Sequence, residues 1–383
     1  MELHEGKTQE AQFPGGGRFR RVLYNEVVKA KRIIVIVGPT AGGKSELAVL
    51  LAEGLRAPDG APGEVINADS MQVYRHLDAG TAKPEAELRA RADHYLLDIV
   101  EPTERFTAAD WLTQAEQLIA AMQARGQMPM VVGGTNLYLK ALLEGMFAGP
   151  AIDLELRATL AALPNEELHR RLLRADPAAA QRIHHNDRKR MIRALEVFTQ
   201  TGQPISTHQQ QWRAWGTENR NAKTTEDAVT PAIPETLNPQ PHTPSSPYQH
   251  NPILIGLDWP TEAINQRINA RVKAMFYPAA CGLASESLPD EVRRLEAAGK
   301  LGPQARLALG YQQVLEHLAG RCTLAEAFEQ TKIQTRRFAK RQRTWLKRYL
   351  GVHWIPAADR TPAELLAAAM TAVNAVLAAD EHR

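Results

Sequence analysis

The sequence lacks the features that mark secreted, zinc-binding and membrane proteins. Its 383 residues include two cysteines, Cys281 and Cys322, which are too few and too far apart for a disulfide framework or a zinc site. No apolar stretch approaches the roughly 18 residues of a membrane-spanning helix, and no cleavable leader is recognisable. The formal net charge is only +3, so the chain as a whole does not demand a polyanionic partner. We therefore expect a globular protein of the cytoplasm with no membrane association.

A phosphate-binding motif is present in full. The apolar run IIVIV at 33–37 leads into GPTAGGKS at 38–45, which fits G-x-x-x-x-G-K-[ST] without a mismatch. Its glycines let backbone N–H groups surround an anion, its lysine supplies a positive charge and its serine suits Mg²⁺. The alternative is a glycine-rich turn that binds nothing. The predicted phosphate-binding residues are Gly38, Pro39, Thr40, Ala41, Gly42, Gly43, Lys44 and Ser45.

Short apolar runs alternate with helical patterns along the chain. The runs lie at 64–68, 94–99, 128–135 and 252–258, and this alternation predicts an α/β fold with a three-layer parallel sheet that contains the phosphate loop (P-loop). A helical insertion domain interrupts it. The predicted organisation is a flexible tail at 1–29, the first part of the P-loop core at 30–149, the helical insertion at 150–213, a Pro-rich disordered linker at 214–251, the return of the core with basic helices at 252–355, and a C-terminal helix and tail at 356–383.

One acid that a P-loop ATPase normally carries is missing. The strand at 130–132 ends in Gly133-Gly134-Thr135, where ATPases usually place the aspartate that holds Mg²⁺. Asp69 instead follows the strand at 64–68, at the edge where open α/β sheets bind ligands. It is a candidate base or metal-orienting residue, and a turn or helix cap is an equally good interpretation. The pattern disfavours an ATPase and leaves a P-loop kinase open.

Two segments are strongly basic. Residues 331–350 hold eight lysines and arginines and no acid, interleaved with Phe338, Trp345 and Tyr349. This pattern favours a helix that binds nucleic acid over one that is merely a soluble surface, because phosphates can neutralise the cations and bases can stack on the rings. Residues 182–193 are also basic, with Asp187 as their one acid. Taken alone, this second segment is more simply a solvated helix face, and an RNA contact is the alternative.

The motifs, in their order, resemble the bacterial tRNA dimethylallyltransferases, the IPP transferase family. The resemblance covers about residues 32–355 and rests on GPTAGGKS at 38–45, NADSMQVY at 67–74, GTAKP at 80–84, GGTNLY at 133–138, RKR at 188–190 with RALE at 193–196, GY at 310–311, and TRRFAKRQ at 335–342 with Thr344-Trp345. It implies transfer of a dimethylallyl group from dimethylallyl diphosphate to N6 of adenosine 37, in tRNAs that read codons beginning with U. The products would be N6-(dimethylallyl)adenosine and diphosphate.

The resemblance also implies roles for particular residues. Asp69 would be the general base, Thr40 would lie beside the reacting centre, and Arg271 would bind diphosphate together with the P-loop and Mg²⁺ at Ser45. The helical insertion would clasp the anticodon stem-loop of the tRNA, and the protein would act as a monomer. The implied tRNA contacts are Asp69, Ser70, Met71, Gln72, Thr135, Arg157, Lys189, Arg190, Met191, Ile192, Arg193, Lys340, Arg341, Gln342, Arg343, Thr344, Trp345, Leu346 and Lys347.

Two other functions remain as hypotheses at this point. A P-loop kinase or NTPase that acts on a nucleotide would need to turn over ATP, and the missing strand-end acid counts against it. A non-catalytic RNA-binding protein with a vestigial P-loop would need neither the intact GGKS at 42–45 nor Asp69.

Overall fold

The computed structural model describes residues 32–55, 62–147, 149–208 and 248–381. The predicted N-terminal tail and residues 214–247 of the predicted linker lie outside them. The chain divides into two compact units, Met1–Leu143 with Ser245–Arg383 and Glu144–Pro244, and each is described by itself. None of the helices in these ranges is both long and apolar enough to span a membrane.

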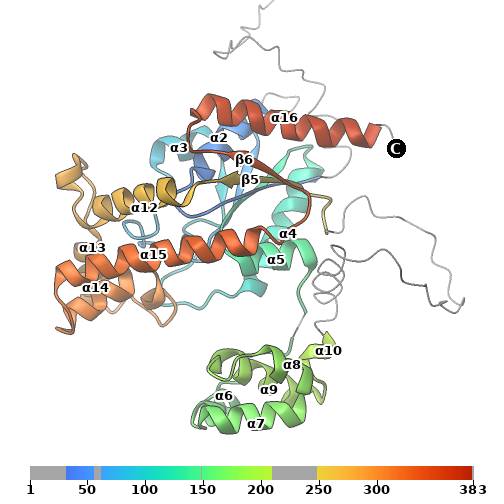
Figure 1. Ribbon diagram of the computed structural model, residues 1–383, viewed down its shortest axis with the longest axis vertical. Coiled ribbons are helices and arrows are strands. Elements are labelled where there is room, and N and C mark those ends of the chain that lie inside the picture. The colour runs from blue at the N-terminus through green and yellow to red at the C-terminus, as the bar shows by residue number, and fades with distance from the viewer. Residues whose placement is uncertain (1–31, 56–61, 148, 209–247, 382–383) are drawn as a thin grey trace, which may run out of the picture. The chain divides into compact units, whose positions relative to one another are not determined.

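A parallel sheet forms the centre of the larger unit (Figure 1). Within the described residues it has six strands in the order β3-β2-β4-β1-β5-β6, all paired in parallel. The predicted α/β fold with a parallel sheet is therefore confirmed. Because parallel strands all end on one edge, that edge collects the loops that follow them. The strands are β1 (Ile34–Val37), β2 (Glu64–Ala68), β3 (His94–Tyr95), β4 (Pro129–Gly133), β5 (Ile253–Asp258) and β6 (Val352–Pro356).

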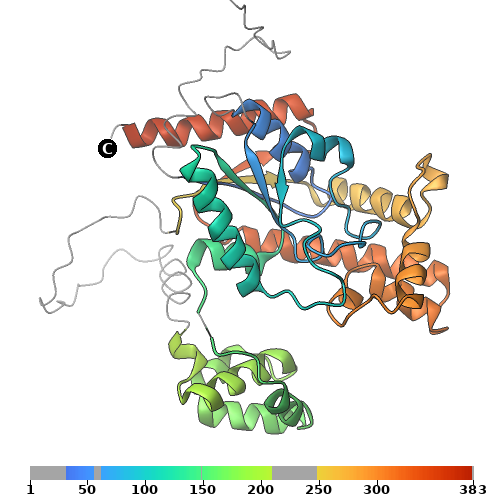
Figure 2. The same ribbon diagram turned by 180° about the vertical axis from the view of Figure 1, so that it is seen from behind.

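Helices cover both faces of this sheet (Figures 1 and 2). On one face, α2 (Lys44–Gly54) packs against α16 (Pro362–Glu381). The other face carries α4 (Ala108–Ala124) and α5 (Asn136–Glu144). The fully buried Trp111 of α4 stacks on Tyr138 of α5 and donates from Nε1 to the Asn67 carbonyl at 2.8 Å. This bond fixes the end of β2, directly before Asp69.

A long helix, α15 (Leu324–Leu346), carries most of the basic segment. Thr323 begins it with a capping box, in which its side chain accepts from the Glu326 N–H and the Glu326 carboxylate accepts from the Thr323 N–H. The helix packs along α12 and α14. The remaining helices of this unit are α3 (Ala86–Arg91), α12 (Thr261–Phe276), α13 (Leu288–Ala297) and α14 (Tyr311–Leu318), with short 3-10 turns at Ala279–Cys281 and Ala305–Leu307.

Short helices make up the described part of the smaller unit. Their apolar faces meet in a core that includes Leu168, Leu172, Met191 and Val197, all fully buried. The first helix is capped by Asp153, whose carboxylate accepts from the Leu156 N–H at 2.9 Å. The helices are α6 (Leu154–Ala161), α7 (Asn165–Ala175), α8 (Pro177–Arg182), α9 (Arg188–Thr201) and α10 (Ile205–His208).

The structure corrects two details of the predicted strands. The apolar run 94–99 was expected to be one strand, but only His94–Tyr95 pairs with the sheet, because Leu96 and Asp98 have φ values of 59° and 57°. Left-handed residues of this kind cannot continue an extended strand. The edge strand β6 was not predicted at all. It is half exposed and ends in Pro356, which suits an edge position.

The end of the predicted linker also differs from expectation. Residues 248–251 were assigned to it, yet Tyr248 is buried and its hydroxyl accepts from the Leu350 N–H at 2.7 Å. His250 contacts Glu116 of α4, with 3.0 Å between Nε2 and Oε1. Residues 248–251 therefore belong to the larger unit and not to the linker.

The close approach of β2 to β4 gives a test of the packing. A Cβ at Gly133 would lie 2.2 Å from the Ala68 carbonyl oxygen, which is backbone and cannot move aside cheaply. We predict that Gly133→Ala destabilises the protein by about 2 kcal/mol or more, because it overpacks the sheet. Thermal unfolding followed by circular dichroism measures this. Gly54→Ala is the matched control, since its nearest neighbours lie 3.9 Å away; an equal effect of both substitutions would contradict the prediction.

Candidate active site

A cavity of about 130 Å³ opens at the carboxyl edge of the sheet. Its walls come from segments that are far apart in the sequence and that the parallel strands bring together. The predicted loop 40–45 lines it beside Asp69, and Arg271 of α12 and Gln342 of α15 complete it. The structure thus brings residues 40–45, Asp69 and Arg271 into one cavity, whereas Gly38 and Pro39, also predicted to bind phosphate, are not part of its lining.

The P-loop is held in shape from outside. Trp259 donates from Nε1 to the Gly42 carbonyl at 3.1 Å, and Arg267 donates from Nε to the Ala41 carbonyl at 2.8 Å. The Arg267 guanidinium also lies 4.8 Å from the centre of the Trp259 ring. Gly43 has φ 85° and precedes the first residue of α2. The first N–H groups of that helix have no partner within the helix, so they form an anion-binding end.

Gln342 joins the P-loop to the turn after β4. Its Oε1 accepts from the Thr40 N–H at 2.9 Å, and its Nε2 donates to the Gly134 carbonyl at 2.9 Å. The residue is buried. It was expected to contact tRNA, and this stays a prediction: both ends of its amide bind inside the protein, and the side chain also lines the cavity.

Arg271 reaches the cavity from α12. Its Nη1 donates to Thr40 Oγ1 at 3.0 Å and its Nη2 donates to the Thr81 carbonyl at 3.2 Å. Its Nε is buried and has no hydrogen-bond partner among the described residues. Burial lowers the pKa of Arg271 to about 10, Asp69 opposes that shift, and Arg267 adds to it. A partly buried cation that lines a cavity is suited to binding an anion.

Lys44 is a second partly buried cation in the same cavity. Its Nζ donates to the Pro39 carbonyl at 2.8 Å. Burial lowers its pKa to about 8, an effect that Asp69 opposes and Arg271 increases. The protein alone therefore stabilises the charged form of Lys44 poorly, and a bound polyanion would supply the missing negative charge.

Asp69 caps the turn after β2 and also lines the cavity. Its Oδ1 accepts from the N–H groups of Met71 and Gln72, at 2.9 Å and 3.4 Å, so it does cap the turn after β2. The carboxylate also lines the cavity, close enough to influence the pKa values of Lys44 and Arg271. Next to it, Thr135 Oγ1 accepts from the Ser70 N–H at 3.0 Å and ties this turn to α5.

The basic part of α15 has one exposed and one buried face. Lys340, Arg341, Thr344, Trp345 and Lys347 are exposed. The Arg348 guanidinium lies 4.4 Å from the Trp345 ring centre, which leaves an aromatic and cationic surface. The neighbouring Arg343 donates from Nη1 to Thr261 Oγ1 at 3.0 Å. The Leu346 side chain is fully buried, so the expectation that it contacts tRNA is wrong for that side chain.

In the smaller unit, some of the predicted RNA-binding residues are exposed and others are buried. Lys189 and Arg190 are exposed and Ile192 is half-buried, whereas Met191 is fully buried and its side chain cannot reach RNA. Arg157 and Arg193 both bind the fully buried Glu196, at 2.8 Å and 2.6 Å. Burial alone would raise the pKa of Glu196, but the hydrogen bonds from Arg157 and Arg193 outweigh burial and lower it. This cluster ties α6 to α9.

The chain is similar in sequence to IPP transferases and to proteins named tRNA dimethylallyltransferase. The model of the IPP transferase family matches residues 72–349. The tRNA dimethylallyltransferase of Geobacter sulfurreducens is 40% identical over 337 residues, which is 86% of this chain and 94% of that protein. The tRNA dimethylallyltransferase 2 of Geotalea uraniireducens is 40% identical over 329 residues, covering 85% of this chain and 92% of that protein.

Solved structures give the same result. A full-length tRNA isopentenylpyrophosphate transferase from Bacillus halodurans matches with a TM-score of 0.60 and 32% identity, covering 92% of this chain and all of that one. A eukaryotic dimethylallyltransferase acting on tRNA matches with a TM-score of 0.63 and 25% identity, covering 85% and 74%. The chain therefore belongs to the IPP transferase family.

Proposed function

We propose that this protein transfers a dimethylallyl group from dimethylallyl diphosphate to N6 of adenosine 37 in tRNAs that read codons beginning with U. The observation that carries the proposal is the pair of partly buried cations, Lys44 and Arg271, that lines one cavity with Asp69. Relatives named tRNA dimethylallyltransferase, similar over most of the chain, support the same activity.

The cations suit the leaving group of this reaction. As the bond between the dimethylallyl carbon and the diphosphate oxygen breaks, negative charge builds up on the departing diphosphate. Lys44, Arg271 and the N–H groups at the start of α2 are already in place to stabilise that charge. Thr40 is held by Arg271 through its hydroxyl and by Gln342 through its N–H. We propose that Thr40, held in this way, lies beside the reacting centre.

Asp69 suits the other half of the reaction. The N6 amine of adenosine is a weak nucleophile because its lone pair is delocalised into the ring, so it must lose a proton as the new C–N bond forms. The turn amides contact only Oδ1 of Asp69, and we assign Oδ2 to the amine proton. One carboxylate then holds the turn in shape and serves as general base.

Magnesium is part of the proposal, and the residues present fit it. No group of three or more His, Cys, Asp or Glu side chains that could hold a metal occurs among the described residues. Mg²⁺ with phosphate substrates commonly takes only one or two protein ligands and completes its shell with phosphate oxygens and water. We propose that the Ser45 hydroxyl holds it. When bound, it would neutralise charge on the diphosphate.

We propose that the tRNA backbone binds to the exposed cations at the C-terminal end of α15, which are Lys340 and Arg341 in the helix and Lys347 directly after it. Trp345 among them offers a ring on which a base can stack. We further propose that the active form is a monomer in the cytoplasm.

The activity is tested by incubating the protein with unmodified tRNA, Mg²⁺ and radiolabelled dimethylallyl diphosphate. We expect label in the anticodon loop, at adenosine 37, and release of diphosphate. A parallel reaction with ATP distinguishes the kinase alternative. ATP turnover without any prenyl transfer would overturn the proposal, and RNA binding without either reaction would favour a non-catalytic RNA-binding protein.

Replacing the proposed base gives a sharper prediction. Asp69→Asn keeps an oxygen that can accept from Met71 and Gln72, so the turn should persist, but the amide cannot take the proton. We expect kcat to fall by about 10² or more with tRNA affinity largely retained, measured by single-turnover kinetics and filter binding. Asp93→Asn replaces an exposed aspartate and serves as control. Full activity of Asp69→Asn would remove the residue from this role.

The lowered pKa of Lys44 predicts how diphosphate binding depends on pH. A bound polyanion favours the charged amine and raises its pKa above the value of about 8 in the free protein. Proton uptake is therefore expected near pH 8, and affinity for inorganic diphosphate should fall by up to about tenfold per pH unit above it. Titration calorimetry in buffers of different ionisation enthalpy measures both quantities.

Lys44→Arg provides the control for this experiment, because arginine stays charged throughout the range. The difference between the two proteins isolates the titration of Lys44 from protons exchanged by diphosphate itself. Identical proton uptake by both proteins would contradict the assignment.

A further inference from the structure

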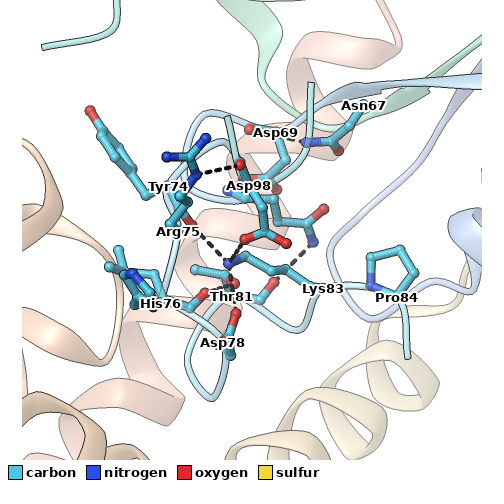
Figure 3. A network of polar contacts seen from close by, with 12 residues as sticks. Asn67, Asp69, Tyr74, Arg75, His76, Asp78, Thr81, Lys83, Pro84 and Asp98 are labelled. Carbon is cyan, nitrogen blue, oxygen red and sulfur yellow. Dashed lines mark hydrogen bonds and ion pairs between the residues drawn. The ribbon is translucent and has the colours of Figure 1, made fainter. Parts of the chain in front are cut away.

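The segment Gly80-Thr81-Ala82-Lys83-Pro84 has no role in the reaction described so far. It is the second half of a tight loop, residues 77–84, that lies between the turn after β2 and α3 (Figure 3). The Thr81 hydroxyl donates to the Leu77 carbonyl within the loop, and Ala82 has a φ of 47°. A left-handed alanine is strained, so surrounding contacts must hold the loop in this conformation.

The side chain of Lys83, which is part of the loop, supplies such contacts. Its side chain is 3% exposed, and its Nζ donates to the Tyr74 carbonyl and to Asp78 Oδ1, each at 2.7 Å, and to Asp98 Oδ1. All three donors of the ammonium group are therefore used. Asp98 is itself fixed, because its Oδ2 accepts from Arg89 Nη1 at 2.9 Å. Figure 3 shows Lys83 at the centre of this network.

A second set of contacts holds the same loop from α13 and α14. The buried Glu291 accepts through Oε2 from the N–H groups of Asp78 and Ala79, at 3.1 Å and 2.9 Å. Tyr311 donates its hydroxyl proton to the other oxygen of Glu291. The Tyr311 ring also lies so close to Gly80 that a Cβ there would be 2.3 Å from it. The loop is thus fixed on two sides.

Two backbone carbonyls of this loop accept hydrogen bonds from side chains that line the cavity. The Thr81 carbonyl accepts from Arg271 Nη2 at 3.2 Å and from Gln72 Nε2 at 3.0 Å. The Ala82 carbonyl accepts from the same Gln72 nitrogen at 3.1 Å. The Arg271 guanidinium donates to this carbonyl and to the Thr40 hydroxyl, so the loop conformation decides where one half of the guanidinium lies.

We propose that Lys83 is a positioning residue, whose ammonium group fixes the 77–84 loop so that the Thr81 carbonyl orients Arg271 toward the diphosphate. The inference rests on the proposed function, because it takes Arg271 as a diphosphate contact. Lys83 itself touches no substrate. Lys83 is not among the residues that line the cavity, and its effect on binding passes through the backbone of Thr81 and Ala82.

The test is a double-mutant cycle on the full chain, with inorganic diphosphate as the probe and calorimetry as the measurement. Lys83→Met keeps the length of the side chain and removes its donors, and we expect it to weaken diphosphate binding about tenfold. Arg271→Met should weaken binding more. If Lys83 acts through Arg271, the double variant should bind within about twofold of Arg271→Met alone.

The outcomes separate three cases. Losses that multiply in the double variant, or wild-type affinity in a folded Lys83→Met protein, overturn the role of Lys83. Wild-type affinity in Arg271→Met contradicts the proposed function itself. Lys300→Met, which replaces an exposed lysine, is the matched control and should bind diphosphate like the wild type.

A milder variant keeps the test usable if Lys83→Met does not fold, as judged by circular dichroism. Asp78→Asn removes the charge of one acceptor whose side chain is 62% exposed, so the fold should tolerate it. We expect it to weaken binding about threefold and to have no additional effect in an Arg271→Met background. An effect of the same size in both backgrounds overturns the proposal.

Discussion

The parallel pairing of β1 with β4 on one side and β5 on the other is the constraint on which the site depends. Val37, the last residue of β1, lies opposite Gly133 and Gly256. On the next strand, Ala68 also lies opposite Gly133. Strands in this register end at one level, so the P-loop residues 40–45, which come after β1, and Asp69, which follows β2, line one cavity without any long loop to bring them together.

Helix α15 carries groups of two kinds on opposite faces. Ala339, Gln342 and Leu346 are spaced by three and four residues and form a buried face, while Lys340, Arg341 and Lys347 are exposed. The buried Gln342 contacts the P-loop and the turn after β4. The helix whose exposed face is proposed to bind RNA is therefore also a rigid wall of the diphosphate cavity. Its position sets the distance between the two proposed substrates.

Sequence reasoning succeeded where the signal was local. The P-loop, the strand before it and the acid after β2 each show in fewer than about fifteen consecutive residues. Gln342 and Trp259 could not be identified as P-loop supports, because their partners lie 302 and 217 residues away. Met191 and Leu346 were assigned to RNA as members of contiguous basic motifs. Helical periodicity buries some residues of any such motif, and here it buries these two.

The missing strand-end acid follows from the packing of the sheet. A side chain at Gly133 would collide with the Ala68 carbonyl, and a Cβ at Gly134 would lie 2.2 Å from Gln342 Nε2. The turn after β4 therefore has no room for a carboxylate while Gln342 binds there. The metal-holding acid of a P-loop ATPase and the Gln342 support are mutually exclusive in this geometry. With that acid absent, the carboxylate at the end of β2 is available for proton transfer, which fits amine alkylation better than ATP hydrolysis.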